Sequence, residues 1–224
     1  MTDATPTAAP FQLQLSKGSP LSEQVYDQLK AAIVQGLLPP ETRLTETEVA
    51  QQTGVSPTPV REAFRRLAAE GFLEIAPWRG VKVRSITEKE ILETYQCREV
   101  LEGLACRLAA AAIEVNGLQK LRHLIKKSQE ASSASEIVTL NSAIHTLILE
   151  YAGNAKLRAT LGLFHETIIR DRTLTAYSTS RQQEIHSEHD AIFAALEAGD
   201  GDAAEQAMRT HVRNGYAYRQ HSPA

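Results

Sequence analysis

The chain has few of the features that mark exported, membrane-embedded or disulfide-stabilised proteins. Its 224 residues include only two cysteines, Cys97 and Cys106, too few for a zinc knuckle or a disulfide framework. No apolar run approaches the roughly 20 residues that span a bilayer. Residues 1–15 lack a basic start followed by an apolar core, so they resemble a disordered lead-in and not an export signal. We therefore expect a cytoplasmic protein with no membrane segment.

Net charge is also low, at −3, but it is unevenly distributed along the chain. Between Ser56 and Ser85 there are six basic and three acidic residues, an excess of +3 that leaves −6 for the rest of the chain. A local excess of cations on an acidic protein is typical of a nucleic-acid-binding surface. A solvated helix face would have the same charge count, so charge alone leaves both interpretations open.

Residues 16–86 begin with the pattern of two helices joined by a short connection. Periodic apolar residues predict a first helix that ends near Gly36. Thr45 and Glu48 form a capping box that starts a second, short helix, and this helix ends at Gly54. A short helix followed by a glycine turn is how a helix-turn-helix begins.

A third helix and a pair of strands complete this first predicted domain. The third helix begins at Ser56 and ends at Gly71, and its apolar stripe leaves three arginines outside. Segments 72–75 and 81–84 predict a two-stranded wing whose outer face carries Lys82. In a winged helix-turn-helix the start of the third helix reads base edges, while wing cations and helix N–H groups hold phosphates.

The segment from Leu21 to Val83 resembles the DNA-binding domain of the GntR family of bacterial regulators. The match is carried by Gly36, Pro39-Pro40, Leu44 to Glu46, Glu48 to Ala50, Gly54 to Ser56, Thr58 to Ala63, Leu67, Glu70 to Leu73 and Arg79 to Val81. The resemblance implies binding to double-stranded operator DNA, with Arg61, Thr58 and Gly80 among the contacts. The full set of predicted DNA-binding residues is Ser56, Thr58, Arg61, Arg65, Arg79, Gly80 and Lys82.

Two positions depart from the pattern of that family. The family usually has a base-reading arginine directly after the serine, where Pro57 stands here. Another arginine is common early in the second helix, where Thr47 stands. Losing one arginine–guanine pair removes about 1–3 kcal/mol of discrimination. We therefore expect an operator that differs from the family's common one, or weaker affinity for each half-site.

Residues 87–219 are predicted to form an all-α antiparallel bundle. Thr87 and Glu90 form a capping box directly after the wing, and little sign of strand follows. Helical patterns occur near 87–112, 115–132, 135–152, 155–173, 181–198 and 202–218. Short breaks between successive helices favour antiparallel neighbours. The predicted fold class is therefore mainly α, with an N-terminal winged helix-turn-helix and a C-terminal helical bundle.

Three histidines lie on apolar stripes of the predicted bundle. His145 follows Asn141 by one helical turn, so both present ligand atoms on one face. His189 and His211 lie 11 residues before and after Asp200, the centre of the last loop. At about 1.5 Å per residue each is roughly 16 Å from that loop, so an antiparallel pair brings them level. Converging neutral imidazoles suit a divalent transition metal, whereas a single such histidine is usually a hydrogen-bonded core residue.

The second domain is similar to the effector domain of the FadR branch of the GntR family, known as the FCD domain. The match is carried by Asn141-x3-His145, Gly153-Asn154, Glu188-His189 and His211. The resemblance implies a homodimer, a small organic acid as effector and a metal, Zn or Ni, held by Asn141, His145, His189 and His211. The family prefers aspartate where Asn141 stands. A neutral amide holds metal less tightly and leaves one more positive charge, which favours an anionic effector.

Two further residues are candidates for binding that effector. Arg98 shares an apolar stripe with Tyr95 and is placed to clamp a carboxylate, although a surface ion pair is an equal alternative. His165 is placed to line the same cavity. The remaining histidines, His123, His186 and His221, are predicted to be exposed.

Together these patterns predict a ligand-responsive transcriptional regulator and not an enzyme. We expect a homodimer that presents two winged helices to a pseudo-palindromic operator, because two-fold symmetry matches paired half-sites. Repression relieved by the acid is favoured, and activation fits the same sequence. The competing hypothesis is a metal-dependent hydrolase on the bundle. It leaves the winged helix unexplained, and the apolar stripes that carry the histidines offer no Asp or Glu as a general base.

Overall fold

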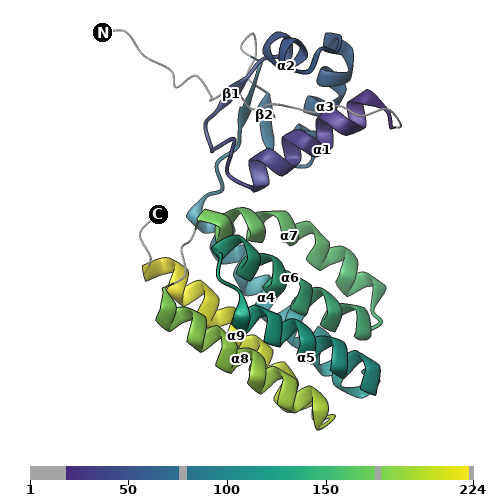
Figure 1. The fold of residues 1–224 in the computed structure, drawn as a ribbon, viewed down its shortest axis with the longest axis vertical. Helices are drawn as coiled ribbons and strands as arrows, with labels where there is room; N and C mark the ends of the chain where they lie inside the picture. The colour runs from purple at the N-terminus through teal and green to yellow at the C-terminus, as the bar shows by residue number, and fades with distance from the viewer. Residues whose placement is uncertain (1–18, 76–79, 175–177, 222–224) are drawn as a thin grey trace. The chain divides into compact units, whose positions relative to one another are not determined.

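The computed structural model describes residues 19–75, 80–174 and 178–221, which form two compact units divided between Ile86 and Thr87 (Figure 1). The described residues are mainly helical, with one small sheet, which confirms the predicted fold class. The predicted lead-in, residues 1–15, and the tip of the wing, residues 76–79, lie outside the described residues.

The N-terminal unit, residues 19–86, has three helices and a three-stranded antiparallel sheet. Its helices are α1 (Leu21–Val34), α2 (Glu46–Thr53) and α3 (Pro57–Ala69), and its strands are β1 (Arg43–Leu44), β2 (Leu73–Ile75) and β3 (Val81–Val83). The strand order is β1-β3-β2, with Leu44 opposite Val81. Strand β1 was not predicted, because two residues are too short to show an alternating pattern. It ties the start of α2 to the wing.

The turn of the helix-turn-helix forms as its sequence predicts. The Thr45 hydroxyl accepts from the Glu48 N–H at 3.2 Å, and a Glu48 carboxylate oxygen accepts from the Thr45 N–H at 3.0 Å. Helix α2 ends at Gly54, which adopts φ +68°, a left-handed conformation that favours glycine. Ser56 then occupies the N-cap position of α3, with Pro57 as the first helical residue. The α2–α3 angle is thus set by local chemistry.

The core of the N-terminal unit lies between α1, α3 and the sheet. Its fully buried side chains include Val25, Leu29, Val60, Leu67 and Val83. The apolar stripe of α3 is buried in this core, so the opposite side of α3 faces solvent.

The C-terminal unit, residues 87–221, is a bundle of helices, which confirms the predicted architecture. Its members are α4 (Glu88–Ala112), α5 (Val115–Glu130), α6 (Ala134–Tyr151), α7 (Ala155–Leu174), α8 (Thr179–Glu197) and α9 (Gly201–His221). The predicted capping box at Thr87 and Glu90 is present. Helix α4 packs along α9, and α6, α7 and α8 also contact α4, so α4 is the central helix (Figure 1). No helix among the described residues is long and apolar enough to cross a membrane.

Candidate metal centre and nucleic-acid interface

The three predicted histidines come together inside the bundle. His145 projects from α6, His189 from α8 and His211 from α9. One ring nitrogen of each lies within 4.8 Å of the other two. His189 is 1% exposed and His211 3% exposed. Three imidazoles that converge from three helices in a water-poor interior form a donor set suited to a divalent transition metal.

Two glutamates hold the rings from behind. Glu102 Oε2, on α4, lies 2.5 Å from Nδ1 of His145. Glu188 Oε2, on α8, lies 2.7 Å from Nδ1 of His211. On the opposite side of the rings, Nε2 of His145 lies 3.1 Å from Nε2 of His211. Carboxylates behind ligating imidazoles fix ring orientation and tautomer in protein metal sites.

Both glutamates are ionised near neutral pH. Burial acts to raise the pKa of Glu188, but hydrogen bonds from His211 and Arg181 outweigh it and lower that pKa to about 2. Burial opposes ionisation of Glu102 too, yet the charge of Arg98 and the hydrogen bond with His145 hold its pKa well below the usual range. An ionised carboxylate can only accept a hydrogen bond, so each Nδ1 that faces one carries a proton.

This tautomer leaves two nitrogen lone pairs facing each other. In a neutral ring with the proton on Nδ1, Nε2 is an acceptor. The Nε2 atoms of His145 and His211 would therefore repel at 3.1 Å, unless a cation lies between the rings. A proton on one ring or a metal ion bonded to both satisfies the pair. With both rings neutral, this pair of nitrogens could therefore hold a cation.

Asn141, the predicted fourth ligand, has a buried oxygen that is unpartnered within the described part of the chain, on the same helix as His145. It precedes His145 by one turn on α6, and it is 6% exposed. Its Oδ1 atom is buried and has no hydrogen-bond partner among the described residues. Leaving a buried acceptor unsatisfied costs about 1–3 kcal/mol, so a ligand for that oxygen would be stabilising.

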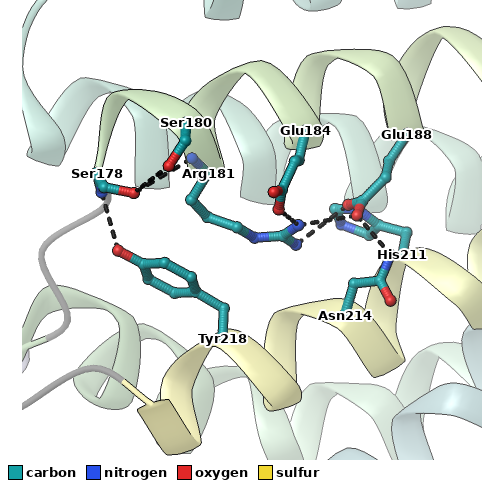
Figure 2. A network of polar contacts seen from close by, with 8 residues as sticks. All are labelled: Ser178, Ser180, Arg181, Glu184, Glu188, His211, Asn214 and Tyr218. Atoms are coloured by element: carbon teal, nitrogen blue, oxygen red, sulfur yellow. Dashed lines mark hydrogen bonds and ion pairs between the residues drawn. The ribbon is translucent and has the colours of Figure 1, made fainter.

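The glutamate on α8 is itself locked by a buried polar network (Figure 2). Glu188 Oε1 accepts from Arg181 Nη1 at 2.8 Å and from Asn214 Nδ2 at 2.7 Å. Arg181 Nη2 donates to Glu188 Oε2 at 3.1 Å, and Arg181 is only 2% exposed. Glu184 accepts a further bond from Arg181 at 3.0 Å. The His211 ring therefore has a fixed partner with little freedom to turn.

A cavity of about 320 Å³ adjoins His145. Its polar lining includes His145, Glu102, Arg98 and Arg158. The remaining lining residues are mostly apolar: Ala105, Ser142, Thr146, Ile148, Leu149, Leu161, Gly162 and Met208. A pocket with apolar walls and a few converging polar groups is the usual form of a small-ligand site.

Arg98 lies in this cavity as a buried residue. It is 2% exposed, and its Nε donates to Glu102 Oε1 at 2.6 Å. The sequence left a surface ion pair as the alternative role for Arg98. An ion pair does form, but it is buried. Arg98 Nη1 is also buried and has no hydrogen-bond partner among the described residues. The side chain of His165, the other predicted effector ligand, lies outside the described residues.

Two expectations about the bundle were wrong. Carboxylates do stand beside the histidines, because Glu102 and Glu188 both contact imidazole nitrogens. Glu102 was missed because it comes from α4, which carries no histidine, and Glu188 because it lies beside the stripe and not on it. His186 is half-buried, with its Nε2 atom inaccessible, and is not an exposed residue. His123 and His221 are exposed, as expected. Arg158 gave no signal in the sequence, since it occupies an ordinary exposed helix position.

On the N-terminal unit, the predicted base-reading residues lie on the open side of α3. Ser56, Thr58 and Arg65 are exposed, and the Ser56 side chain makes no capping hydrogen bond. The Arg61 side chain is 51% exposed and pairs with Glu46 of α2, with Nη2 at 2.6 Å and Nε at 2.9 Å from its carboxylate oxygens. A carboxylate therefore occupies one hydrogen-bonding face of the Arg61 guanidinium.

The wing shows the same partial neutralisation. Lys82 Nζ lies 3.0 Å from Glu41 and 3.4 Å from Glu74 carboxylate oxygens. Gly80 has φ +79°, and a Cβ there would lie 2.4 Å from the Leu44 carbonyl oxygen, so close packing alone requires glycine. Arg79 lies outside the described residues.

Two other cations of the basic segment serve the fold. The Arg66 guanidinium stacks 3.7 Å from the centre of the Tyr26 ring, and Arg84 Nε donates to the Gly71 carbonyl at 2.9 Å. The basic surface is thus smaller than the charge count of the segment suggests, because acids outside the segment and internal contacts both reduce it.

Comparison with known families assigns both units. Residues 21–83 match the model of bacterial regulatory proteins of the gntR family, and residues 93–214 match the FCD domain. The chain is 36% identical to the probable D-xylose utilization operon transcriptional repressor of Paenarthrobacter nicotinovorans, over 86% of this chain and 85% of that protein. It is 30% identical to the HTH-type transcriptional repressor RspR of Escherichia coli K12, over 90% of each chain.

Similarity extends to a further relative and to solved structures. The uncharacterized HTH-type transcriptional regulator YdhC of Bacillus subtilis is 30% identical over 93% of this chain and 95% of its own length. E. coli McbR/YncC has the same fold, with a TM-score of 0.75, 24% identity, and coverage of 91% of this chain and 98% of that chain. A GntR regulator from Rhodococcus sp. RHA1 also has a TM-score of 0.75, at 22% identity, covering 89% and 97% of the two chains.

Proposed function

Because the chain belongs to the GntR family of bacterial transcriptional regulators and carries an FCD domain, we propose that it is a repressor controlled by a small carboxylate. The observation that carries this proposal is the set of three histidines, backed by two glutamates, beside a cavity that contains a buried arginine. Repression is favoured over activation because two similar proteins are named as repressors.

The DNA-contacting residues in this proposal are those on the open side of α3 and on the wing. Ser56 and Thr58, at the start of α3, are placed to reach base edges, and Arg61 and Arg65 follow one and two turns later. Lys82 and Arg79 supply phosphate contacts, and Gly80 lets the wing backbone approach closely. Binding through phosphates weakens steeply as salt concentration rises.

We further propose that the bundle forms the homodimer through α4. This helix carries exposed apolar residues at regular spacing: Leu92, Val100 and Leu104. Apolar residues one or two turns apart form a continuous stripe, which a second copy can cover. Val100→Glu is expected to shift sedimentation from dimer to monomer. An unchanged dimer would place the interface elsewhere.

The metal is proposed to bind to His145, His189 and His211, with Asn141 as an oxygen donor. Zn and Ni are the favoured ions, since neutral imidazoles accept both. When bound, such an ion would supply positive charge beside the cavity, which favours an anionic ligand. Arg98 then donates to the carboxylate of the acid from within the cavity. Glu102 and Glu188 keep the proton on Nδ1 of their histidines, so that Nε2 stays available.

Elemental analysis of protein purified without a histidine tag tests the metal. Wild type should carry about one equivalent of a transition metal per chain, and His189→Ala should carry none. His123→Ala, which removes an exposed histidine, is the matched control and should keep the metal. Equal metal content in all three proteins would refute this site.

Gel-shift analysis of the DNA upstream of the protein's own gene tests the regulatory function. We expect a shift that weakens as salt rises, because phosphate contacts release counterions. A thermal-shift screen of organic, sugar and amino acids, with and without metal, then identifies the effector. Turnover of esters or amides without any DNA shift would instead support the hydrolase hypothesis.

A further inference from the structure

One carboxylate of the bundle is shared between the metal site and the cavity. Glu102 accepts from Arg98 Nε through Oε1 at 2.6 Å, and its Oε2 lies 2.5 Å from Nδ1 of His145. Arg98 and Glu102 project from α4 one turn apart, and His145 projects from α6. Glu102 thus joins the predicted effector ligand directly to a predicted metal ligand.

At the arginine end of this series of contacts, Arg98 lies beside the cavity and has spare bonding capacity. Arg98 lines the cavity, and its buried Nη1 has no hydrogen-bond partner among the described residues. Leaving a charged donor unsatisfied in the interior is costly. A carboxylate in the cavity would satisfy Nη1 while Nε stays on Glu102. The apolar walls suit an acid with a compact apolar body.

We propose that Glu102 is the coupling residue through which metal binding and acid binding strengthen each other. The proposal rests on the proposed function, since it takes the histidines as the metal site and the cavity as the acid site. It adds a named route between the two, which acts as a positioning relay and not as a direct ligand of either partner.

The direction of the coupling follows from charge. A cation on Nε2 of His145 makes its Nδ1–H a stronger donor, so Glu102 is drawn more strongly to the ring. Glu102 then neutralises less of the Arg98 charge, and Arg98 attracts an anion more strongly. By linkage, an acid bound to Arg98 must tighten metal binding by the same factor.

The zinc affinity of metal-free full-length protein, measured by competition with a chromophoric chelator, tests this coupling. Benzoate is the acid probe, with chloride as the salt control. In wild type we expect benzoate to tighten zinc binding by about fivefold or more, the lower end of ordinary allosteric coupling. In Glu102→Gln the benzoate effect should fall below about twofold. Zinc binding itself should also weaken about 10–100-fold, as for other partners of metal-bound histidines.

Glu99→Gln is the matched control. Glu99 lies on the same helix but forms an exposed pair with Arg213, so its loss should leave the benzoate effect intact. If Glu102→Gln does not fold, Arg98→Gln removes the other end of the relay and should abolish the benzoate effect while zinc still binds.

The outcomes separate this proposal from the function it rests on. No zinc binding in wild type would overturn the metal site and the coupling together. Zinc binding with no benzoate effect in wild type would overturn the coupling alone. An undiminished benzoate effect in Glu102→Gln or Arg98→Gln would show that the acid acts on the metal directly, and would reject Glu102 as the relay.

Discussion

Arginine–glutamate pairs occur in both units, but their surroundings differ. In the N-terminal unit Arg61 pairs with Glu46 at the surface, with half of the arginine side chain exposed. In the bundle Arg181 pairs with Glu188, and the arginine is almost completely buried. An exposed pair contributes about 0–1 kcal/mol and exchanges partners readily. A buried pair cannot lose one member without leaving an uncompensated charge.

This difference matches what each unit is proposed to bind. A DNA backbone is a large polyanion, which can displace surface glutamates from arginines at little cost. A small ligand offers only a few contacts, so its site must be held in place before the ligand arrives. The exposed Arg61–Glu46 pair can therefore exchange its carboxylate for DNA, whereas the buried Arg181–Glu188 pair holds its site in place.

The largest effect is expected from breaking a buried pair. Arg181→Ala leaves Glu188 without its cation and should lower the free energy of unfolding by about 3–5 kcal/mol. Urea denaturation followed by circular dichroism measures this loss. Arg213→Ala breaks the exposed pair with Glu99 and should cost at most about 1 kcal/mol. Equal losses for the two variants would erase the distinction between buried and exposed pairs.

A smaller but specific effect is expected from Arg61→Ala. Removing a base-contacting arginine should weaken operator binding by about 1–3 kcal/mol, or roughly 5–150-fold. Fluorescence anisotropy with a labelled operator measures the change. Arg122→Ala, which removes an exposed arginine of the bundle, serves as the control and should leave DNA affinity unaltered. If both substitutions act alike, the α3 surface is not the DNA-binding face.

Gly80→Ala tests whether the backbone of the wing is constrained at Gly80, in contrast to the surface ion pairs, which can change partners. The left-handed φ and the contact with the Leu44 carbonyl should together cost about 1–3 kcal/mol of stability. Gly36→Ala is a comparison, because Gly36 has φ +75° but open space around its missing side chain. Thermal unfolding should therefore show a larger loss for Gly80→Ala. A Gly80 variant with full stability and weak DNA binding would assign this glycine to DNA contact alone.

The smallest effect is expected from Glu46→Gln. This substitution tests most directly whether DNA displaces Glu46 from Arg61. This substitution removes the carboxylate that competes with DNA for Arg61, so operator affinity should rise about two- to fivefold. Glu23→Gln, which makes the same charge change at an exposed position of α1, should raise the affinity less. Weaker DNA binding by Glu46→Gln would mean that Glu46 positions Arg61 for the DNA and does not compete with it.

Most of the architecture could be predicted from local patterns. The capping boxes at Thr45 and Thr87 formed as expected, because each involves residues three positions apart. Counting residues from the loop at Asp200 was enough to place His189 level with His211, because both antiparallel helices rise by the same distance per residue. Features that depend on residues close together in the sequence could thus be predicted.

What could not be predicted depends on contacts between distant segments. Glu41 and Glu46 lie outside the basic segment, yet they pair with Lys82 and Arg61 across the fold. The contact between Glu102 and His145 joins different helices, and no periodicity signals it. A charge count along the chain therefore overestimated the basic surface, and a stripe analysis missed the carboxylates behind the histidines.

If the proposed regulation is right, ligands of the bundle change the DNA affinity of the N-terminal unit. The most direct test is operator binding by the full-length protein, measured by anisotropy without ligand and with zinc plus the acid found in the thermal-shift screen. We predict a change in Kd of about 5–150-fold in wild type and none in His189→Ala. Identical affinities under both conditions in wild type would contradict the account.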